Sequence, residues 1–585
     1  MPSSLVTSNS LLAIDVGAAN TRAVLFDVIE GEYRFVASGI APSTAEAPFK
    51  DVAEGARNAV INLQKILGKN LLDASRGIIT PAQADGSGVD ALVVTLSAGP
   101  AVKTVVVGLL KDISLDSARR LTESTYTRIM DSMSLSDQRK PDQQIDSLLR
   151  VRPELVVIAG GTDGGASRSI QKLLEPIGLA SFLMPEEKRP TVLFAGNEKM
   201  EEEVKTLVGS LSTSLHFSPN IRPSLETEDI DPAERELARI IINIRKRQIK
   251  GVDLLDLWSG GHMLPTAYAT GRMVRFLSKV YGSQKGILSV DMGASATVIA
   301  AGFNNKSVLK VFPQFGLGQN LVNLLNHTTL ENILQWSSLD ISPGVLLDYL
   351  HQKSLYPATI AATKEDLAIS QAIARQALNL AMQFARKDFP QNIANIKPSL
   401  TPLFEPIFAG GGTLSDASRP GQSLLLLLDG LQPVGITTII LDQNNLLPML
   451  GVAASQNNIL PVQVLESGAF LSIGTVVSPV VSARYGASIL KARLTYENGT
   501  EAAIDLKFGS LETLPLANGE TGKLIIQVSH GADVGFGPGR GGTIPVSGGA
   551  LGVVFDGRGR PLDLPSDPVR RRELIKKWNW SLGGG

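Results

Sequence analysis

Residues 13–21 read AIDVGAANT and residues 289–297 read SVDMGASAT, and this pair of segments decides the fold. In each segment an apolar run ends in an aspartate, an apolar residue and a glycine, and small residues then lead to a threonine at the matching position. A second apolar run follows both segments, which predicts a strand–turn–strand hairpin in each. Two hairpins of one plan in distant parts of the chain predict a duplicated architecture.

The segments after the first hairpin predict an α/β lobe. The apolar run 23–26 and the stretch 33–39 extend the hairpin into a small meander, and residues 47–67 carry apolar positions at helical spacing. The β-branched runs 92–94 and 105–107 have the composition of buried strands.

Residues 115–282 repeat a pattern of strand, glycine-containing turn and helix. The apolar run 155–158 leads into AGGTDGG at 159–165, and the run 191–194 leads into AGN at 195–197. This repetition is typical of parallel-sheet units. Two interpretations of the 160–165 loop stay open: a phosphate or partner contact, or a tight connection that requires positive φ angles.

The remainder of the chain predicts a second lobe and a different final part. Residues 315–400 are mainly helical in pattern, and a strand near 407–409 leads into Gly410, Gly411 and Gly412. After residue 462, short β-type runs alternate with turns, and a helix is expected at 567–580. The predicted boundaries are 1–283 for lobe I with its expanded α/β region, 284–461 for lobe II, and 462–585 for a β-rich C-terminal domain with a terminal helix.

Composition argues against several classes of function. A net charge of −1 gives no global field for nucleic acid or an anionic membrane. The absence of cysteine excludes disulfides, thiolate metal sites and cysteine nucleophiles, and the five histidines show no paired-ligand spacing. No apolar run approaches the roughly 20 residues that span a bilayer, and no leader segment precedes the first strand. We therefore expect a soluble cytoplasmic protein that binds neither nucleic acid nor membrane.

The two hairpins have the residues that a phosphate site needs. A turn of small residues lets backbone N–H groups approach phosphate oxygens, and an aspartate at a strand end can hold hydrated Mg²⁺. Asp15 and Asp291 are therefore the candidate catalytic residues and the candidate Mg²⁺ ligands, acting through water. The candidate phosphate-binding residues are Gly17, Asn20, Thr21, Gly293, Ser295 and Thr297. Hydrolysis at such a site needs mainly positioning and charge stabilisation.

The order of the two hairpins and the 410–412 segment resembles the phosphate-1, phosphate-2 and adenosine motifs of the actin-like ATPase superfamily. More closely, the chain resembles the MutL/GlmL family, the accessory proteins associated with adenosylcobalamin-dependent glutamate mutase and unrelated to mismatch repair. The segments that carry this resemblance are 105–109, 157–165, 194–197 and 535–542. The GGTDGG and GPGRGG stretches within them are the most specific.

The resemblance implies an α/β fold of two actin-like (ribonuclease H-like) lobes around a nucleotide cleft, plus the β-rich C-terminal domain. It implies ATP and Mg as ligands, with Gly410, Gly411 and Gly412 against the adenosine. The implied function is an ATP-binding accessory or reactivation protein, chaperone-like, for a partner mutase such as glutamate mutase. A homo-oligomer is compatible with this reading.

Two alternative functions remain open. One is a degenerate actin-like scaffold or assembly protein whose nucleotide is structural or lost. The other is a small-molecule kinase of the same superfamily, which requires a substrate base between the lobes that the sequence does not reveal.

The chain departs from the family pattern in both hairpins. Relatives usually carry serine or threonine where Ala18 and Ala19 stand, and Ala294, Ala296 and Val298 replace a glycine, a threonine and an aspartate of the second hairpin. Loss of one oriented polar group can lower a rate on the order of 10²–10³-fold. We expect slow or absent ATP hydrolysis, with binding less affected because the backbone amides remain.

Overall fold

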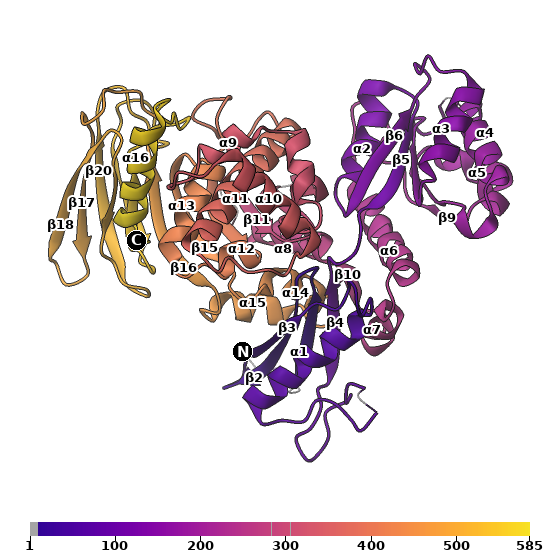
Figure 1. Ribbon diagram of the computed structural model, residues 1–585, viewed down its shortest axis with the longest axis horizontal. Helices are drawn as coiled ribbons and strands as arrows, with labels where there is room; N and C mark the ends of the chain where they lie inside the picture. Colours follow the sequence, from indigo (N-terminus) through magenta and orange to yellow (C-terminus); the bar gives the residue numbers. More distant parts are fainter. Residues whose placement is uncertain (1–9, 76, 166, 282–283, 305, 585) are drawn as a thin grey trace.

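The computed structural model describes residues 10–75, 77–165, 167–281, 284–304 and 306–584. Two lobes are built on two mixed sheets, a third α/β body is inserted in the first lobe, and a β-rich part follows the second (Figure 1). The final helix, α16 (Pro568–Ser581), lies beside the C-terminal strands (Figure 1).

The first sheet has the strand order β10-β4-β1-β2-β3. Strands β1, β2 and β3 form an antiparallel meander, whereas β4 runs parallel to β1 and to β10. The strands are β1 (Leu11–Val16), β2 (Asn20–Ile29), β3 (Glu32–Pro42), β4 (Ala91–Leu96) and β10 (Met263–Pro265). Helices α1 (Val52–Leu67) and α7 (Val252–Trp258) bury apolar residues against one face of this sheet.

Capping fixes both ends of α1. The Asp51 side chain accepts a hydrogen bond from Ala53 N at 3.0 Å, and Gly68 ends the helix in the left-handed conformation with a φ of 66°. The helix therefore begins at Val52 and not at Ala47, where apolar spacing alone predicts its start.

The second sheet repeats the plan of the first. Its strands β13-β12-β11-β14-β15 follow the same order, with an antiparallel meander and two parallel strands beside it. They are β11 (Gly286–Met292), β12 (Thr297–Phe303), β13 (Lys306–Phe312), β14 (Phe404–Gly410) and β15 (Gly435–Leu441). The duplicated architecture predicted from the two hairpins is confirmed, and with it the α/β fold of two actin-like lobes.

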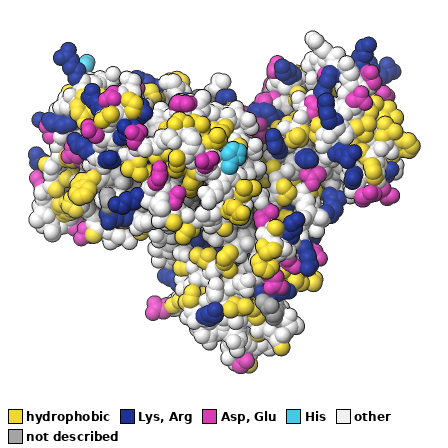
Figure 2. All heavy atoms as spheres, in the orientation of Figure 1, with side chains coloured by type: hydrophobic (Ala, Val, Ile, Leu, Met, Phe, Trp, Pro, Cys, Tyr) yellow, Lys and Arg dark blue, Asp and Glu magenta, His cyan; other side chains and the backbone are white. Residues whose placement is uncertain are grey.

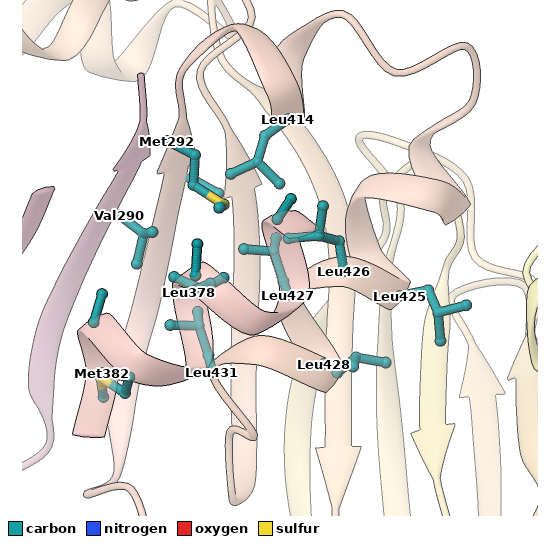
Figure 3. Packing of buried hydrophobic residues seen from close by; sticks show 14 of the residues in the cluster. Val290, Met292, Leu378, Met382, Leu414, Leu425, Leu426, Leu427, Leu428 and Leu431 are labelled. Carbon is teal, nitrogen blue, oxygen red and sulfur yellow. The ribbon is translucent and has the colours of Figure 1, made fainter. Parts of the chain in front are cut away.

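Helices of lobe II cover the outer face of its sheet. They are α9 (Leu330–Leu334), α10 (Pro343–Leu355), α11 (Lys364–Ala385), the short α12 (Gly412–Ser415) and α13 (Pro420–Gly430). Figure 3 shows Leu378 of α11 and Leu427 of α13 facing Val290 and Met292 of β11. Burying one such side chain contributes about 1.5–3 kcal/mol, so this packing holds the second hairpin from behind.

Three helices lie between the two sheets. They are α8 (Thr266–Tyr281), α14 (Leu446–Ala453) and α15 (Ile459–Glu466). Their apolar residues share one buried cluster with the inward faces of both sheets, for example Met273 with Val24 and Val298. The lobes are therefore joined by a common core beneath the hairpins.

The region between β4 and β10 forms a separate sheet of five parallel strands in the order β6-β5-β7-β8-β9. The strands are β5 (Val102–Gly108), β6 (Thr127–Met133), β7 (Leu155–Ala159), β8 (Thr191–Phe194) and β9 (Ser214–Phe217). Its helices are α2 (Asp116–Thr122), α3 (Pro141–Val151), α4 (Ser167–Leu183), α5 (Glu201–Val208) and α6 (Asp231–Gln248). We call this body, residues 99–248, the inserted domain.

The loop at 160–165 has a visible structural role. Gly160, Gly161 and Gly164 have φ angles of 148°, 73° and 77°. The Asp163 carboxylate accepts a hydrogen bond from Asn220 Nδ2 at 2.8 Å, which ties the loop to the segment after β9. These features agree with a tight connection that requires glycine.

The C-terminal part contributes to two sheets. Strands β17 (Ser488–Tyr496), β18 (Glu501–Lys507), β20 (Thr521–Val528) and β21 (Gly542–Ser547) form an antiparallel sheet. Strands β16 (Leu471–Ser478), β22 (Val553–Asp556) and β19 (Leu511–Leu514) instead extend the sheet of lobe II. The predicted boundary at residue 462 stays a prediction.

Among the residues that the structure describes, no helix is both long and apolar enough to cross a membrane. Basic, acidic and apolar side chains are interspersed over the visible face of the molecule (Figure 2).

Candidate functional site

The two predicted turns have the same backbone geometry. Gly17 N donates to Asn20 O at 3.0 Å, and Gly293 N donates to Ala296 O at 3.0 Å. A Cβ atom added to Gly17 would lie 2.7 Å from Asn20 O, and one added to Gly293 would lie 3.2 Å from Ala296 O. Both glycines therefore permit tight turns that larger residues would disturb.

Asp15 is held by residues of both lobes. Its Oδ1 accepts hydrogen bonds from Thr95 Oγ1 at 2.6 Å and Thr266 Oγ1 at 3.1 Å, and its Oδ2 accepts one from Asn445 Nδ2 at 2.8 Å. Asn445 follows β15 of lobe II, so the last bond crosses between the lobes. Burial raises the pKa of Asp15, and these hydrogen bonds act against the rise.

Asp291 has a different environment. It ends β11 beside Gly410 of β14, and its Oδ1 is buried without a hydrogen-bond partner. Burial, followed by the charges of Asp15 and Asp442, raises its pKa to about 7. An oriented acceptor without a donor indicates a group that this site can still bind.

Asp442 adds a third carboxylate, and it is buried like Asp15. Its oxygens accept hydrogen bonds from Leu446 N at 2.8 Å and Leu447 N at 2.7 Å, while burial raises its pKa to about 6. Arg22 lies opposite Asp15 in the register of β1 and β2. Its positive charge lowers the pKa of all three acids. Its Nε is buried and has no hydrogen-bond partner.

The glycine segment lies against the second hairpin. A Cβ atom on Gly411 would lie 2.4 Å from Asp291 Oδ1, and Gly411 has a φ of 89°. Gly410 lines a cavity of about 10 Å³ together with Asp291, Asp442 and Asn445. This volume is comparable to that of one water molecule, so a nucleotide at this position requires the lobes to move apart.

The other predicted residues differ in their accessibility. Thr21 is fully buried and its Oγ1 has no hydrogen-bond partner, whereas Thr297 Oγ1 donates to Phe315 O at 2.8 Å. Asn20 is exposed and Ser295 is half-buried. Gly412 begins α12, beside Asp416.

A family model described as MutL protein matches residues 11–468. The chain belongs to the MutL protein family. This membership confirms the resemblance on which the fold was predicted.

The chain is 20% identical over 362 residues to Protein MutL of Clostridium tetanomorphum, covering 56% of this chain and 74% of that one. It is similar to the ethanolamine utilization protein EutJ of Carboxydothermus hydrogenoformans, with 9% identity, 76% and 89% coverage of the two chains and a TM-score of 0.27. It is also similar to a diol dehydratase-reactivating factor in nucleotide free form, with 11% identity, 79% and 100% coverage and a TM-score of 0.30. The assignment of the fold rests on the strand order of the two lobe sheets and not on these structural similarities.

The acidic side chains at this site fit a hydrated cation better than a directly chelated one. Within the described ranges no group of three or more acidic or histidine side chains converges as a metal site. Both Asp15 oxygens are bonded to protein donors, whereas Asp291 Oδ1 is free. The buried Asp15 and Asp442 and the half-buried Asp291, with Arg22 as the neighbouring positive charge, favour an additional cation, and Mg²⁺ usually keeps several of its waters.

Several residues at this site were missed in the sequence. Asp442 ends an apolar strand, as do Asp15 and Asp291, and that shared signal could have identified it. Thr95, Thr266 and Asn445 carry no local motif, because they reach Asp15 only through the pairing of distant strands.

Proposed function

We propose that this MutL-family chain binds ATP with Mg²⁺ between its two lobes and acts as an accessory or reactivation protein for an adenosylcobalamin-dependent mutase such as glutamate mutase. The observation that supports nucleotide binding is the pair of matching turns beside Asp15, Asp291, Asp442 and Arg22. The mutase partner rests on the family resemblance. A cytoplasmic location fits a chain without cysteine.

In this proposal the residues of each lobe have assigned tasks. Backbone N–H groups of the 17–21 and 293–297 turns bind phosphate oxygens. Thr21 Oγ1 is buried on the side of the sheet that α1 covers, 3.2 Å from where a Cβ atom on Gly55 would lie, so it takes no part. Asp15 and Asp291 orient the waters around the metal, and Arg22 offsets their charge. Gly410, Gly411 and Gly412 admit the adenosine. Bound Mg²⁺ would neutralise phosphate charge.

The structure also supports slow hydrolysis. Ala296 and Val298 are packed into the core between the sheets, and the Thr297 hydroxyl is already bonded to Phe315 O. The positions that would orient a water are therefore occupied by apolar packing. Nucleotide binding would then serve mainly to select between lobe arrangements and only secondarily to supply hydrolysis energy.

A second candidate function is a degenerate scaffold with lost nucleotide binding. Two observations favour it: the three hydrogen bonds that satisfy Asp15, and the cavity of only about 10 Å³ beside Asp291. The same hydrogen bonds and the same small cavity are also expected of a nucleotide-binding protein whose lobes are closed and without ligand.

A thermal-shift experiment separates these two functions. A ligand at 100 times its Kd stabilises the folded state by about 2.7 kcal/mol, so Mg-ATP should raise the melting temperature. Magnesium alone and ATP with excess chelator are the controls. A melting temperature that millimolar Mg-ATP leaves unchanged would favour the scaffold.

The accessory role is tested separately by co-purification. The tagged full chain is mixed with purified glutamate mutase subunits, with and without Mg-ATP. Retention of a mutase subunit that depends on nucleotide is the expected result, and no retention in either state would contradict the partner assignment.

A further inference from the structure

One segment of the inserted domain reaches the candidate nucleotide site: residues 119–126, which comprise the end of α2 and the loop before β6. Its first part is fixed to lobe II by a group that we call the clasp, defined by Arg119, Glu123, Lys310 and Asp388. Lys310 Nζ donates to Glu123 Oε2 at 2.6 Å and is also paired with Asp388, and Arg119 Nη2 lies 3.1 Å from Asp388 Oδ1.

The lobe II half of the clasp is shielded from water. The side chains of Lys310 and Asp388 are 2% and 6% exposed, and Val311 N donates to Glu123 O at 2.8 Å. Charges that are screened so little by solvent interact more strongly than surface pairs. This end of the segment therefore follows lobe II when the lobes move.

The other end of the segment lies beside Asp15. Tyr126 is 3% exposed and belongs to the buried cluster between the two sheets. Its hydroxyl faces the Thr266 side chain and the Ala267 backbone, and Thr266 Oγ1 donates to Asp15 Oδ1 at 3.1 Å. Burial, followed by the charges of Asp291 and Asp15, raises the pKa of Tyr126, so its hydroxyl is neutral. Its ring shares the buried cluster with Ala267 of α8, the residue next to Thr266.

The connection between the inserted domain and lobe I lies at the same point. Gly99 has a φ of 105°, and a Cβ atom there would lie 2.5 Å from Ile249 Cδ1 and 2.7 Å from Arg245 Nη1. Arg245, 1% exposed, donates to Pro100 O, and Val102 N just beyond it donates to Tyr126 O at 2.9 Å. On the face shown in Figure 2 a notch separates the upper part of the inserted domain from lobe II. The domain is thus attached at its base, next to Tyr126.

We propose that Tyr126 is a positioning residue for Asp15, and that residues 119–126 couple the placement of the inserted domain to the occupancy of the nucleotide site. The inference rests on the proposed function. When the lobes separate, the Asp15–Asn445 hydrogen bond breaks. The clasp still holds segment 119–126 to lobe II, and the Gly99 connection still holds the inserted domain to lobe I. Because it is attached to both lobes, the inserted domain must rotate, and Tyr126 transmits that rotation to Asp15 through Thr266.

The first test needs no nucleotide. Hydrogen exchange is measured on the full chain for wild type and for Asp388→Asn, which weakens the clasp but leaves Lys310 paired with Glu123. Exchange should rise about fivefold or more in residues 119–126 and also in residues 11–22 around Asp15. The matched control is Glu202→Gln, which removes an exposed ion pair with Lys205 in the same domain and should change neither segment. A rise confined to residues 119–126 would overturn the coupling.

The second test compares two buried tyrosines of one cluster. Tyr126→Phe removes the hydroxyl that faces Thr266, and Tyr33→Phe removes one that accepts from Asn457 Nδ2 at 2.9 Å. Because Tyr126→Phe removes the polar group next to Thr266, it should weaken Mg-ATP binding by about threefold to tenfold and abolish nucleotide-dependent protection of residues 119–126. Tyr33→Phe should leave both readouts at wild-type values.

The outcomes separate the two proposals. If the wild type binds Mg-ATP and the two tyrosine variants behave alike, the positioning role of Tyr126 is wrong and nucleotide binding stands. If the wild type binds no Mg-ATP, the proposed function is wrong, the assignment of Tyr126 falls with it, and the hydrogen-exchange test still decides whether the clasp and Asp15 are coupled.

Discussion

Asp291 is the residue whose state most affects this site. Its pKa is raised from the ordinary value of about 3.9 to about 7, so it binds a proton in the folded state under conditions in which it is ionised in the unfolded state. Ionising Asp291 is therefore harder in the folded state, which lowers the free energy of unfolding. This destabilisation is absent below about pH 4, grows as the pH rises, and is complete above about pH 7.

The variant Asp291→Asn should therefore stabilise the protein by about 2–4 kcal/mol at pH 8 and by much less at pH 5. Urea unfolding at the two pH values measures this difference, with the exposed Asp563→Asn as the control. Equal effects of Asp291→Asn at both pH values would contradict the raised pKa.

The two hairpin threonines differ in whether their hydroxyl groups are hydrogen-bonded. Thr297→Val leaves Phe315 O without its donor and should lower the free energy of unfolding by about 1–3 kcal/mol. Thr21→Val removes a buried hydroxyl that has no partner and faces α1, so it should leave both stability and Mg-ATP binding nearly unchanged. Denaturant unfolding of both variants tests this contrast, and equal losses of stability would contradict it.

At the scale of elements, much of the fold could be predicted. The helix expected at 567–580 is α16 (Pro568–Ser581), and the strand expected near 407–409 is β14 (Phe404–Gly410). Strand β10 was missed because it has three residues and ends in Pro265, and it is defined only by its pairing with β4. The strands β16, β19 and β22 carry no local signal that assigns them to the sheet of lobe II, since their partners are set by tertiary packing.

The contact between the glycine segment and the second hairpin gives a test at this scale. Gly411→Ala would place a Cβ atom 2.6 Å from the Met292 backbone and against Asp291, and should lower stability by about 2–4 kcal/mol. Gly31→Ala is the matched control, because Gly31 has a similar φ of 84° and nothing within 4 Å of the added atom. It should cost about 1–2 kcal/mol from backbone strain alone. Similar losses in both variants would show that the close approach at Gly411 is relaxed.

For the whole molecule, the central feature is a pair of lobes that share a core and meet over buried charge. Besides the Asp15–Asn445 bond, Ser38 Oγ donates to Asn444 Oδ1 at 3.0 Å and Tyr33 N donates to Gln463 Oε1 at 2.8 Å between the lobes. The sequence could predict the two hairpins but not this closed arrangement, because Asn444, Asn445 and Gln463 lie in no motif.

Closed lobes should slow the entry of nucleotide. Asn445→Ala removes the bond to Asp15 and should raise the association rate of Mg-ATP several-fold, because the binding-competent arrangement becomes more populated. Stopped-flow mixing with a fluorescent ATP analogue measures this rate. Asn62→Ala, at a half-buried asparagine that bonds to Ile40 O within lobe I, serves as the control. A slower or unchanged rate in Asn445→Ala would indicate that lobe separation does not limit entry.

The most direct test of a triphosphate held by both hairpins is calorimetric titration of Mg-ATP into wild type, Asp15→Asn and Asp291→Asn. One site per chain is expected, with each single variant weakening the affinity at least about tenfold, because each aspartate orients the same metal from its own lobe. Absence of binding to the wild type, or a full affinity retained by either variant, would contradict the account.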